Sequence, residues 1–175
     1  MTVRVRHFGW HAESLRALIL RAKWHQEWSL IRMLGRWLAE VARSENYAHG
    51  LDGWVAVPRD LRRRLLHGKP LAEHLAAEVG RRLQLPRIAA PRRARRAPQV
   101  ALGAIARRRN LRGAFSLSAR GRQRIRDRRL LLIDDVITTG STIEECAHAL
   151  LDAGAREVRA LVLAVAPDPE SDRGR

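Results

Sequence analysis

The sequence predicts an α/β fold, a mainly parallel sheet flanked by helices and preceded by an N-terminal helical segment. Residues 130–133 (Leu-Leu-Leu-Ile) form an uninterrupted apolar run, which is typical of a strand buried on both faces of a parallel sheet. Short apolar runs of this kind alternate along the chain with segments of helical periodicity. At 175 residues the chain suits one domain with a sizeable core. We divide it into a helical segment over 1–50, a core over 51–167 and a polar tail over 168–175.

Residues 11–43 carry two helical stripes, interrupted at residues 25–27. The first stripe is Leu15, Leu18, Ile19 and Ala22, and the second is Leu30, Ile31, Leu34, Leu38 and Val41. Trp24, Trp28 and Trp37 lie near these stripes, and we expect them to pack against the protein in preference to forming a base-stacking surface. His7 and His11 have the spacing of a helical metal pair. No carboxylate or cysteine nearby completes that site, so both are expected at the surface.

The middle of the chain is predicted to hold further strands and one clear helix. Residues 54–57 form a short strand that ends at Pro58, and residues 157–166 form the last strand. Residues 71–83 form a helix that follows Pro70 and repeats an apolar residue at every fourth position: Leu71, Leu75, Val79 and Leu83. Residues 85–90 and 113–117 are candidate short strands, and the Arg-rich segment 91–110 between them is a loop.

Two carboxylates, Asp134 and Asp135, follow the apolar run where the strand is expected to end, and ligands of open α/β sheets bind at that end. The turn Thr138-Thr139-Gly140-Ser141-Thr142 comes next. A helix then follows, with the apolar face Ile143, Ala147, Leu150 and Leu151 and with Gly154 as its stop. Two pairs have the spacing of a capping box at its start: Ser141 with Glu144, and Thr142 with Glu145.

This order of residues predicts a cradle for a ribose 5-phosphate. The hydroxyls, the backbone N–H groups and the positive helix end of such a turn favour one phosphate, and Gly140 leaves room for it. The adjacent carboxylates can accept hydrogen bonds from vicinal sugar hydroxyls and can hold Mg²⁺ through water. An acidic strand of this kind also occurs in P-loop nucleotide hydrolases, but the sequence contains no G-x-x-x-x-G-K-[ST] loop.

The stretch from Leu130 to Thr142 resembles the signature of the type I phosphoribosyltransferases, which use 5-phosphoribosyl diphosphate (PRPP). The resemblance implies an enzyme in which diphosphate leaves C1 of the ribose, with Mg²⁺ as cofactor and PRPP or a nucleoside monophosphate as ligand. It assigns catalysis and Mg²⁺ to Asp134 and Asp135. The PRPP-binding residues that it implies are Asp134, Asp135, Val136, Thr138, Thr139, Gly140, Ser141 and Thr142.

The wider sequence, from about Phe8 to Pro167, resembles the ComF-type competence branch of that family. The matching positions are Lys23-Trp24, Val55-Ala-Val-Pro58 with Arg63, and the series Gln99, Leu102, Arg107, Asn110 and Gly113-Ala-Phe115. The resemblance implies a diphosphate site at Pro58, Arg63 and Gly68, and a flexible loop with Gln99, Arg107 and Asn110. Two features depart from the branch. Its members usually carry a cysteine-rich zinc module before the matching region, and residues 67–71 (His-Gly-Lys-Pro-Leu) replace an Arg-Gly-Phe-Asn-Gln segment.

The charge distribution leaves a second function open. The net charge is +16, and residues 91–130 contain fourteen arginines and one acid, Asp127. Such a block favours a polyanionic partner such as nucleic acid, although a GC-rich coding sequence would produce the same arginine bias. The alternative to an enzyme of nucleotide salvage or DNA uptake is therefore a catalytically silent PRPP- or nucleotide-sensing module. That module would bind nucleic acid or a protein of the competence machinery through its Arg-rich segment, and a homodimer is a further assembly that we consider.

Cysteine content and hydropathy argue against several other classes of protein. Cys146 is the only cysteine, which excludes an internal disulfide and a cysteine-based zinc site, and it is expected to be a small buried residue. No apolar run approaches the roughly 18 residues of a membrane span. The first residues lack an export signal, so a cytoplasmic location is expected.

Overall fold

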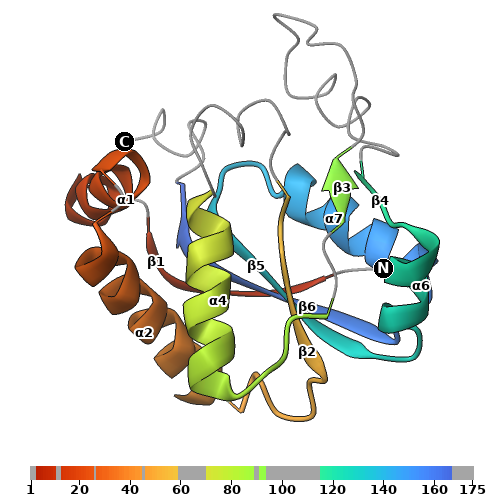
Figure 1. The fold of residues 1–175 in the computed structure, drawn as a ribbon. Coiled ribbons are helices and arrows are strands. Elements are labelled where there is room, and N and C mark those ends of the chain that lie inside the picture. Colours follow the sequence, from red (N-terminus) through yellow and green to blue (C-terminus); the bar gives the residue numbers. More distant parts are fainter. Residues whose placement is uncertain are drawn as a thin grey trace, which may run out of the picture.

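Four parallel strands form the main sheet of the computed structural model, in the order β1-β6-β5-β2 (Figure 1). They are β1 (Arg4–Trp10), β6 (Glu157–Val165), β5 (Arg129–Ile137) and β2 (Gly53–Ala56). The structure describes residues 3–10, 13–25, 27–44, 46–58, 70–88, 91–93 and 115–166. Each adjacent pair of strands runs in parallel, with β5 and β6 in register from Arg129 with Glu157 to Ile137 with Val165. The predicted α/β class with a mainly parallel sheet is confirmed.

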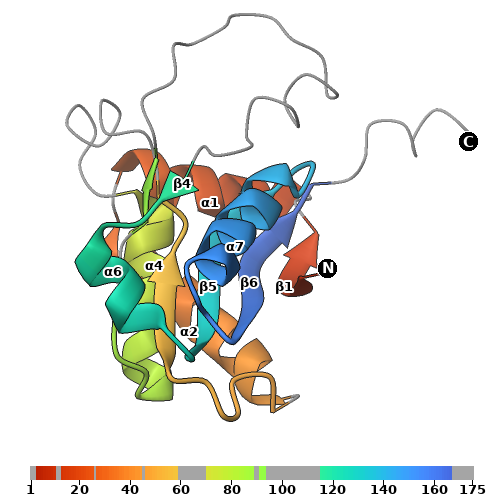
Figure 2. The same ribbon diagram turned by 90° about the vertical axis from the view of Figure 1, so that its right-hand side faces the viewer.

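Helices cover both faces of this sheet (Figure 2). One face is covered by α1 (Glu13–His25), α2 (Trp28–Ser44) and α4 (Leu71–Leu83), and the other by α6 (Ala119–Ile125) and α7 (Ser141–Asp152). The side chains of β5 alternate between the two layers. Leu131 and Ile133 pack with α1, α2 and α4, whereas Leu130 and Leu132 pack with α6 and α7. All four are fully buried, which explains why the run is apolar at every position.

The long helices match the prediction closely. Helix α1 ends at His25 and α2 begins at Trp28, and α4 has the predicted bounds. The side chains of Leu71, Leu75 and Val79 are buried because α4 lies against the sheet and α2. Cys146 is fully buried on α7, as expected. The strands β2 and β6 also form where the apolar runs predict them.

Strand β1 was not predicted. Its sequence, RVRHFGW, has only two partly buried positions because it lies at one edge of the sheet, where it pairs with β6 alone. Helix α6 was also missed, because it is short and rich in arginine and buries only Ile125.

The two candidate short strands differ from the prediction. Residues 85–90 form no strand within the described part, where Arg87 makes a single bridge to Trp54. Of residues 113–117, only Phe115–Ser116 form a strand, β4. It pairs antiparallel with β3 (Arg92–Arg93) in a separate two-stranded sheet, outside the main sheet. Most of the predicted loop 91–110 and the tail 168–175 lie outside the described residues.

The three tryptophans of the helical segment contact the rest of the protein to different extents. Trp24 and Trp28 are 65% and 55% exposed, although the Trp28 ring contacts the edge of His74 on α4. Trp37 is partly buried and stacks on Phe8 with ring centroids 4.9 Å apart. His7 is exposed, on β1 and not on a helix, and His11 lies outside the described residues. Within the described ranges, no helix has the length and apolar character needed to span a bilayer.

Candidate functional site

The acidic pair lies within β5 and not beyond its end. Asp134 and Asp135 are followed by two further strand residues, because β5 continues to Ile137, where the Ala166 N–H donates to the Ile137 carbonyl. The turn itself is shorter than predicted. It comprises residues 138–140, and Ser141 and Thr142 already belong to the first turn of α7. The acids and the turn nevertheless remain adjacent at the carboxyl end of the sheet, as the sequence predicted.

Gly140 sets the direction of the chain between β5 and α7. It is the N-cap residue of α7 and adopts a left-handed conformation, with φ 76° and ψ −19°. An L side chain rarely adopts this conformation, whereas glycine does so readily. Both predicted capping boxes are wrong, because the N-cap residue carries no side chain. The Ser141 hydroxyl instead lies 2.8 Å from that of Thr139, so it braces the turn.

The turn encloses a small hollow suited to an anion. The hollow measures about 40 Å³, room for a group of a few heavy atoms, and its lining is Asp134, Val136, Ile137, Thr138, Thr139, Gly140, Thr142 and Ile143. No side chain at the N-cap position accepts from the first N–H groups of α7, so a bound anion can accept from them. The hydroxyls of the exposed residues Thr138 and Thr139 add further donors.

The two carboxylates are held by the backbone that follows them. One oxygen of Asp134 accepts from the Asp135 N–H at 2.8 Å, and one of Asp135 accepts from the Val136 N–H at 2.9 Å. Their other surroundings differ. Burial, and secondly the negative charge of Asp134, raise the pKa of the Cys146 thiol on α7, so the thiol stays neutral. The charge of Asp134 is therefore felt in the α7 layer. Asp135, only 7% exposed, faces the α1 layer.

Lys23 is a site residue that the sequence analysis did not assign. Its ammonium nitrogen lies 4.0 Å from a carboxylate oxygen of Asp135, which brings the last turn of α1 to the acidic pair. The signal in the sequence was the Lys23-Trp24 pair noted in the family resemblance, which gave no location for it. The contact places the end of α1, part of the N-terminal helical segment, against the acidic pair.

The donor set fits Mg²⁺ held partly by water or by a ligand. Asp134 and Asp135 supply two adjacent carboxylates, and the described residues contain no group of three or more His, Cys, Asp or Glu side chains that could enclose a metal. Mg²⁺ commonly keeps several waters and binds through one or two carboxylates together with substrate phosphates. The site therefore fits such an ion better than a closed structural metal.

The remaining predicted site residues divide into two groups. Pro58 follows β2, and the Val57 N–H donates to the Ile133 carbonyl, which places Pro58 beside the acidic end of β5. The others lie outside the described residues: Arg63, Gly68, Gln99, Arg107 and Asn110. Their predicted roles stay predictions.

Known proteins resemble this chain over most of its length. A family model described as the phosphoribosyl transferase domain matches residues 66–174. Competence protein F of Haemophilus influenzae is 33% identical over 161 residues, which are 89% of this chain and 70% of that protein. DNA utilization protein YhgH of Escherichia coli K12 is 32% identical over 154 residues, 85% of this chain and 66% of that protein.

A solved structure shares the fold. The structure of the allosteric regulatory enzyme of purine biosynthesis superposes with a TM-score of 0.51 at 20% identity, over 75% of this chain and 25% of that one. At this level of identity the likeness concerns the fold alone.

Proposed function

Because this chain belongs to the phosphoribosyl transferase domain family, we propose that it binds PRPP at the end of β5 and transfers the phosphoribosyl group to a nucleophile. The observation that carries the proposal is the left-handed turn at Gly140, which joins an acidic strand end to an uncapped helix N-terminus. A ribose 5-phosphate presents two vicinal hydroxyls and one phosphate. The carboxylates and the turn offer acceptors for the former and donors for the latter.

Each described element has a defined task in this proposal. Asp134 and Asp135 accept hydrogen bonds from the ribose hydroxyls, and their own hydrogen bonds to the backbone limit their motion. The turn at residues 138–140 and the first turn of α7 bind the 5-phosphate. Lys23 balances the charge of the buried Asp135 and adds a cation on the side that faces α1. The predicted contributions of Arg63 and of the Gln99–Asn110 segment belong to residues outside the described ranges.

The reaction breaks the bond between C1 of the ribose and the diphosphate oxygen and forms a bond between C1 and the nucleophile. Positive charge develops on the ribose ring and negative charge on the leaving diphosphate, so positioning and electrostatic stabilisation are the main contributions that a protein can make. Mg²⁺, when bound, neutralises charge on the diphosphate, and Asp134 and Asp135 would hold it through water. No described residue at the site is assigned as a general base.

A second candidate function is a silent PRPP- or nucleotide-binding module that acts with nucleic acid. The observation that favours it is the exposure of Trp10, Trp24 and Trp28, at 62%, 65% and 55%. Trp24 follows Lys23, and Trp10 is paired with Val165, itself the partner of Ile137, so both residues lie at the carboxyl end of the sheet. Exposed aromatic rings stack on unpaired bases. The names of the two relatives, which refer to competence and DNA utilization, are consistent with this candidate.

Calorimetric titration of PRPP with Mg²⁺ tests the main proposal. Wild type is expected to bind, and the double variant Asp134→Asn with Asp135→Asn to lose binding. The control Asp127→Asn with Asp152→Asn removes two exposed acids near the C-terminal ends of α6 and α7, away from the acidic pair, and should keep wild-type affinity. Failure of wild type to bind PRPP or any nucleoside monophosphate contradicts the proposal.

Release of diphosphate separates the two candidates. With a panel of nucleobases as nucleophiles, turnover by wild type identifies a transferase. PRPP binding without turnover, together with salt-sensitive binding of single-stranded DNA that Trp24→Ala weakens, identifies the silent module.

A further inference from the structure

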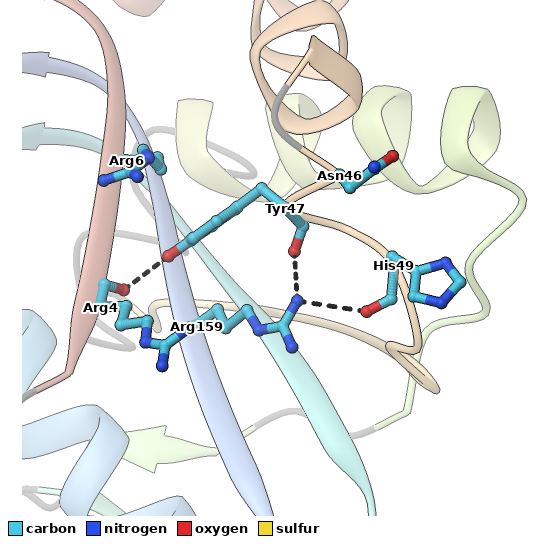
Figure 3. Close-up of a pocket in the computed structure, with 6 residues that line it drawn as sticks. All are labelled: Arg4, Arg6, Asn46, Tyr47, His49 and Arg159. Carbon is cyan, nitrogen blue, oxygen red and sulfur yellow. Dashed lines mark hydrogen bonds between the residues drawn. The ribbon is translucent and has the colours of Figure 1, made fainter.

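A basic pocket of about 320 Å³ lies at the amino end of the sheet, away from the acidic pair. It is formed by the first half of β1, the start of β6 and the turn that follows α2, and its lining is Arg4, Arg6, Asn46, Tyr47, His49 and Arg159 (Figure 3). Arg4 is paired with Arg159 at the start of the β1–β6 ladder, whereas Trp10 and Val165 are paired at its other end. Six residues of strand separate the two ends, which corresponds to roughly 20 Å.

Hydrogen bonds fix Tyr47 and Arg159, two of the residues that line this pocket. The Tyr47 hydroxyl lies 2.7 Å from the Arg4 carbonyl and 3.1 Å from the Ala160 carbonyl, so it ties the turn to both strands. Arg159 donates to the carbonyls of Tyr47 and His49 at 2.6 and 3.2 Å, as Figure 3 shows. The ring of Tyr47 is buried, which fixes the surface on which the basic side chains lie.

Three arginines are among the described residues that line the pocket. Glu157, at the start of β6, pairs with Arg159 at 2.7 Å and with Arg129 at 3.9 Å, so the guanidinium of Arg159 is already engaged within the protein. No acidic side chain is among the described residues that line the pocket. Arg4 and Arg6 lie two residues apart on an edge strand, so their side chains leave β1 on the same side, and both are exposed. The Arg6 guanidinium also lies over the Tyr47 ring, 5.6 Å from its centre.

We propose that this pocket is a second anion site, which binds the phosphate groups of a small polyphosphorylated ligand. A guanidinium group can donate two parallel hydrogen bonds to one phosphate, and Arg4 and Arg6 carry such groups. His49 and Asn46 contribute further donors at the rim. The volume lies at the lower end of the range for small-molecule sites, which suits a compact ligand. The pocket shares no residue with the turn at Gly140, so the proposal does not depend on the PRPP site.

Tyr47 provides a direct probe, because it is the only tyrosine of the chain. Protein labelled with ¹³C in the tyrosine ring gives NMR signals from this pocket alone. Titration with inorganic tripolyphosphate at low salt is expected to shift these signals in a saturable way. In the double variant Arg4→Gln with Arg6→Gln, the apparent affinity for tripolyphosphate should fall by about tenfold or more, as expected for the loss of two charge-assisted contacts. The hydrogen bond of Tyr47 to the Arg4 carbonyl involves the backbone and should survive these substitutions.

Two further variants are controls, one for a general loss of positive charge and one for binding at the carboxyl end of the sheet. Arg32→Gln with Arg36→Gln removes the same charge from the exposed face of α2 and should respond as wild type. Asp134→Asn with Asp135→Asn alters the carboxyl end and should also keep the Tyr47 response. The proposal is overturned if tripolyphosphate leaves the wild-type Tyr47 signals unmoved, or if the Arg4 and Arg6 variant responds as wild type. A shift caused by an oligonucleotide but not by tripolyphosphate also overturns it in favour of a nucleic-acid surface.

Discussion

The carboxyl end of the sheet presents two acids beside a glycine turn, whereas the amino end presents three arginines around one tyrosine. Apart from Lys23, the first site is built from neighbouring residues, 134 to 143, and its donors are mainly backbone N–H groups and hydroxyls. The second is assembled from three distant segments, at β1, at the turn after α2 and at β6, and its donors are side chains. Backbone donors are fixed by the fold, while long side chains must be ordered by their contacts.

This difference determines how each site can fail. At the carboxyl end the conformation of one residue, Gly140, controls the direction in which several donors point. At the amino end the hydroxyl of Tyr47 and the guanidinium of Arg159 connect the segments, so the pocket depends on buried hydrogen bonds. The predictions below test each dependence in order of the expected change in an equilibrium constant.

The largest effect concerns the proton affinity of Tyr47. Burial raises its pKa to about 12 from 10.0, although the charges of Arg6 and Arg159 act in the opposite direction. The phenolate absorbance of wild type should therefore appear with a midpoint near pH 12 in the folded protein, and near the usual value, about 10, in denaturant. The folded state holds this proton more tightly than the unfolded state. Its contribution to stability is thus present below pH 10 and is lost as the pH rises from about 10 to about 12.

The variant Tyr47→Phe supplies the control for that titration. It removes the sole tyrosine, so the absorbance change should disappear. A midpoint near 10 in folded wild type would show that water reaches the Tyr47 hydroxyl. Tyr47 would then not form a buried side of the amino-end pocket.

The second effect is on PRPP affinity and concerns the two glycines that flank α7. Gly140 and Gly154 both have a positive φ, 76° and 102°, and a Cβ at either position meets no heavy atom closer than 3.7 Å. Gly140→Ala and Gly154→Ala should therefore cost a similar ~1–2 kcal/mol of folding stability through backbone strain. Only Gly140→Ala should weaken PRPP binding, by about tenfold or more, because only that strain reorients the donors of the turn.

Thermal unfolding and calorimetry on the matched pair of glycine variants distinguish strain from site geometry. Equal losses of PRPP affinity in both would mean that the turn at Gly140 has no special part in binding. Unchanged affinity in both would remove the phosphate from this turn altogether.

The same division explains what could be predicted from the sequence. The strand over residues 130–133 and α4 depend on patterns within a few consecutive residues, and the structure places them as expected. The acids and the turn are adjacent as expected, although β5 continues to Ile137 and the turn is shorter than predicted. Strand β1 became visible only through its pairing with β6, because it lies at the edge of the sheet and most of its residues are exposed, which leaves no clear apolar pattern. The capping boxes failed for another reason: a left-handed glycine took the N-cap position that the spacing assigned to a hydroxyl.

Contacts between distant segments account for the rest. Lys23 reaches Asp135 only because α1 packs across the end of the sheet, and nothing in the local sequence of either residue indicates that contact. The amino-end pocket likewise requires Arg4, Tyr47 and Arg159 to meet. Trp24 and Trp28 remain more than half exposed because their helices bury a different stripe, and ring size alone does not decide which face of a helix is covered.

The smallest effect tests whether the cation at the carboxyl end assists or opposes the ligand. Lys23→Met keeps much of the side-chain volume but removes the charge 4.0 Å from Asp135. Because the pair is partly exposed, we expect PRPP affinity to fall by only about two- to fivefold, with the larger change at low salt. Arg21→Met is the control, since it removes an exposed cation of the same helix that pairs with Glu27. Tighter PRPP binding by Lys23→Met would mean that Lys23 competes with the ligand for Asp135, and α1 would then restrain the site instead of completing it.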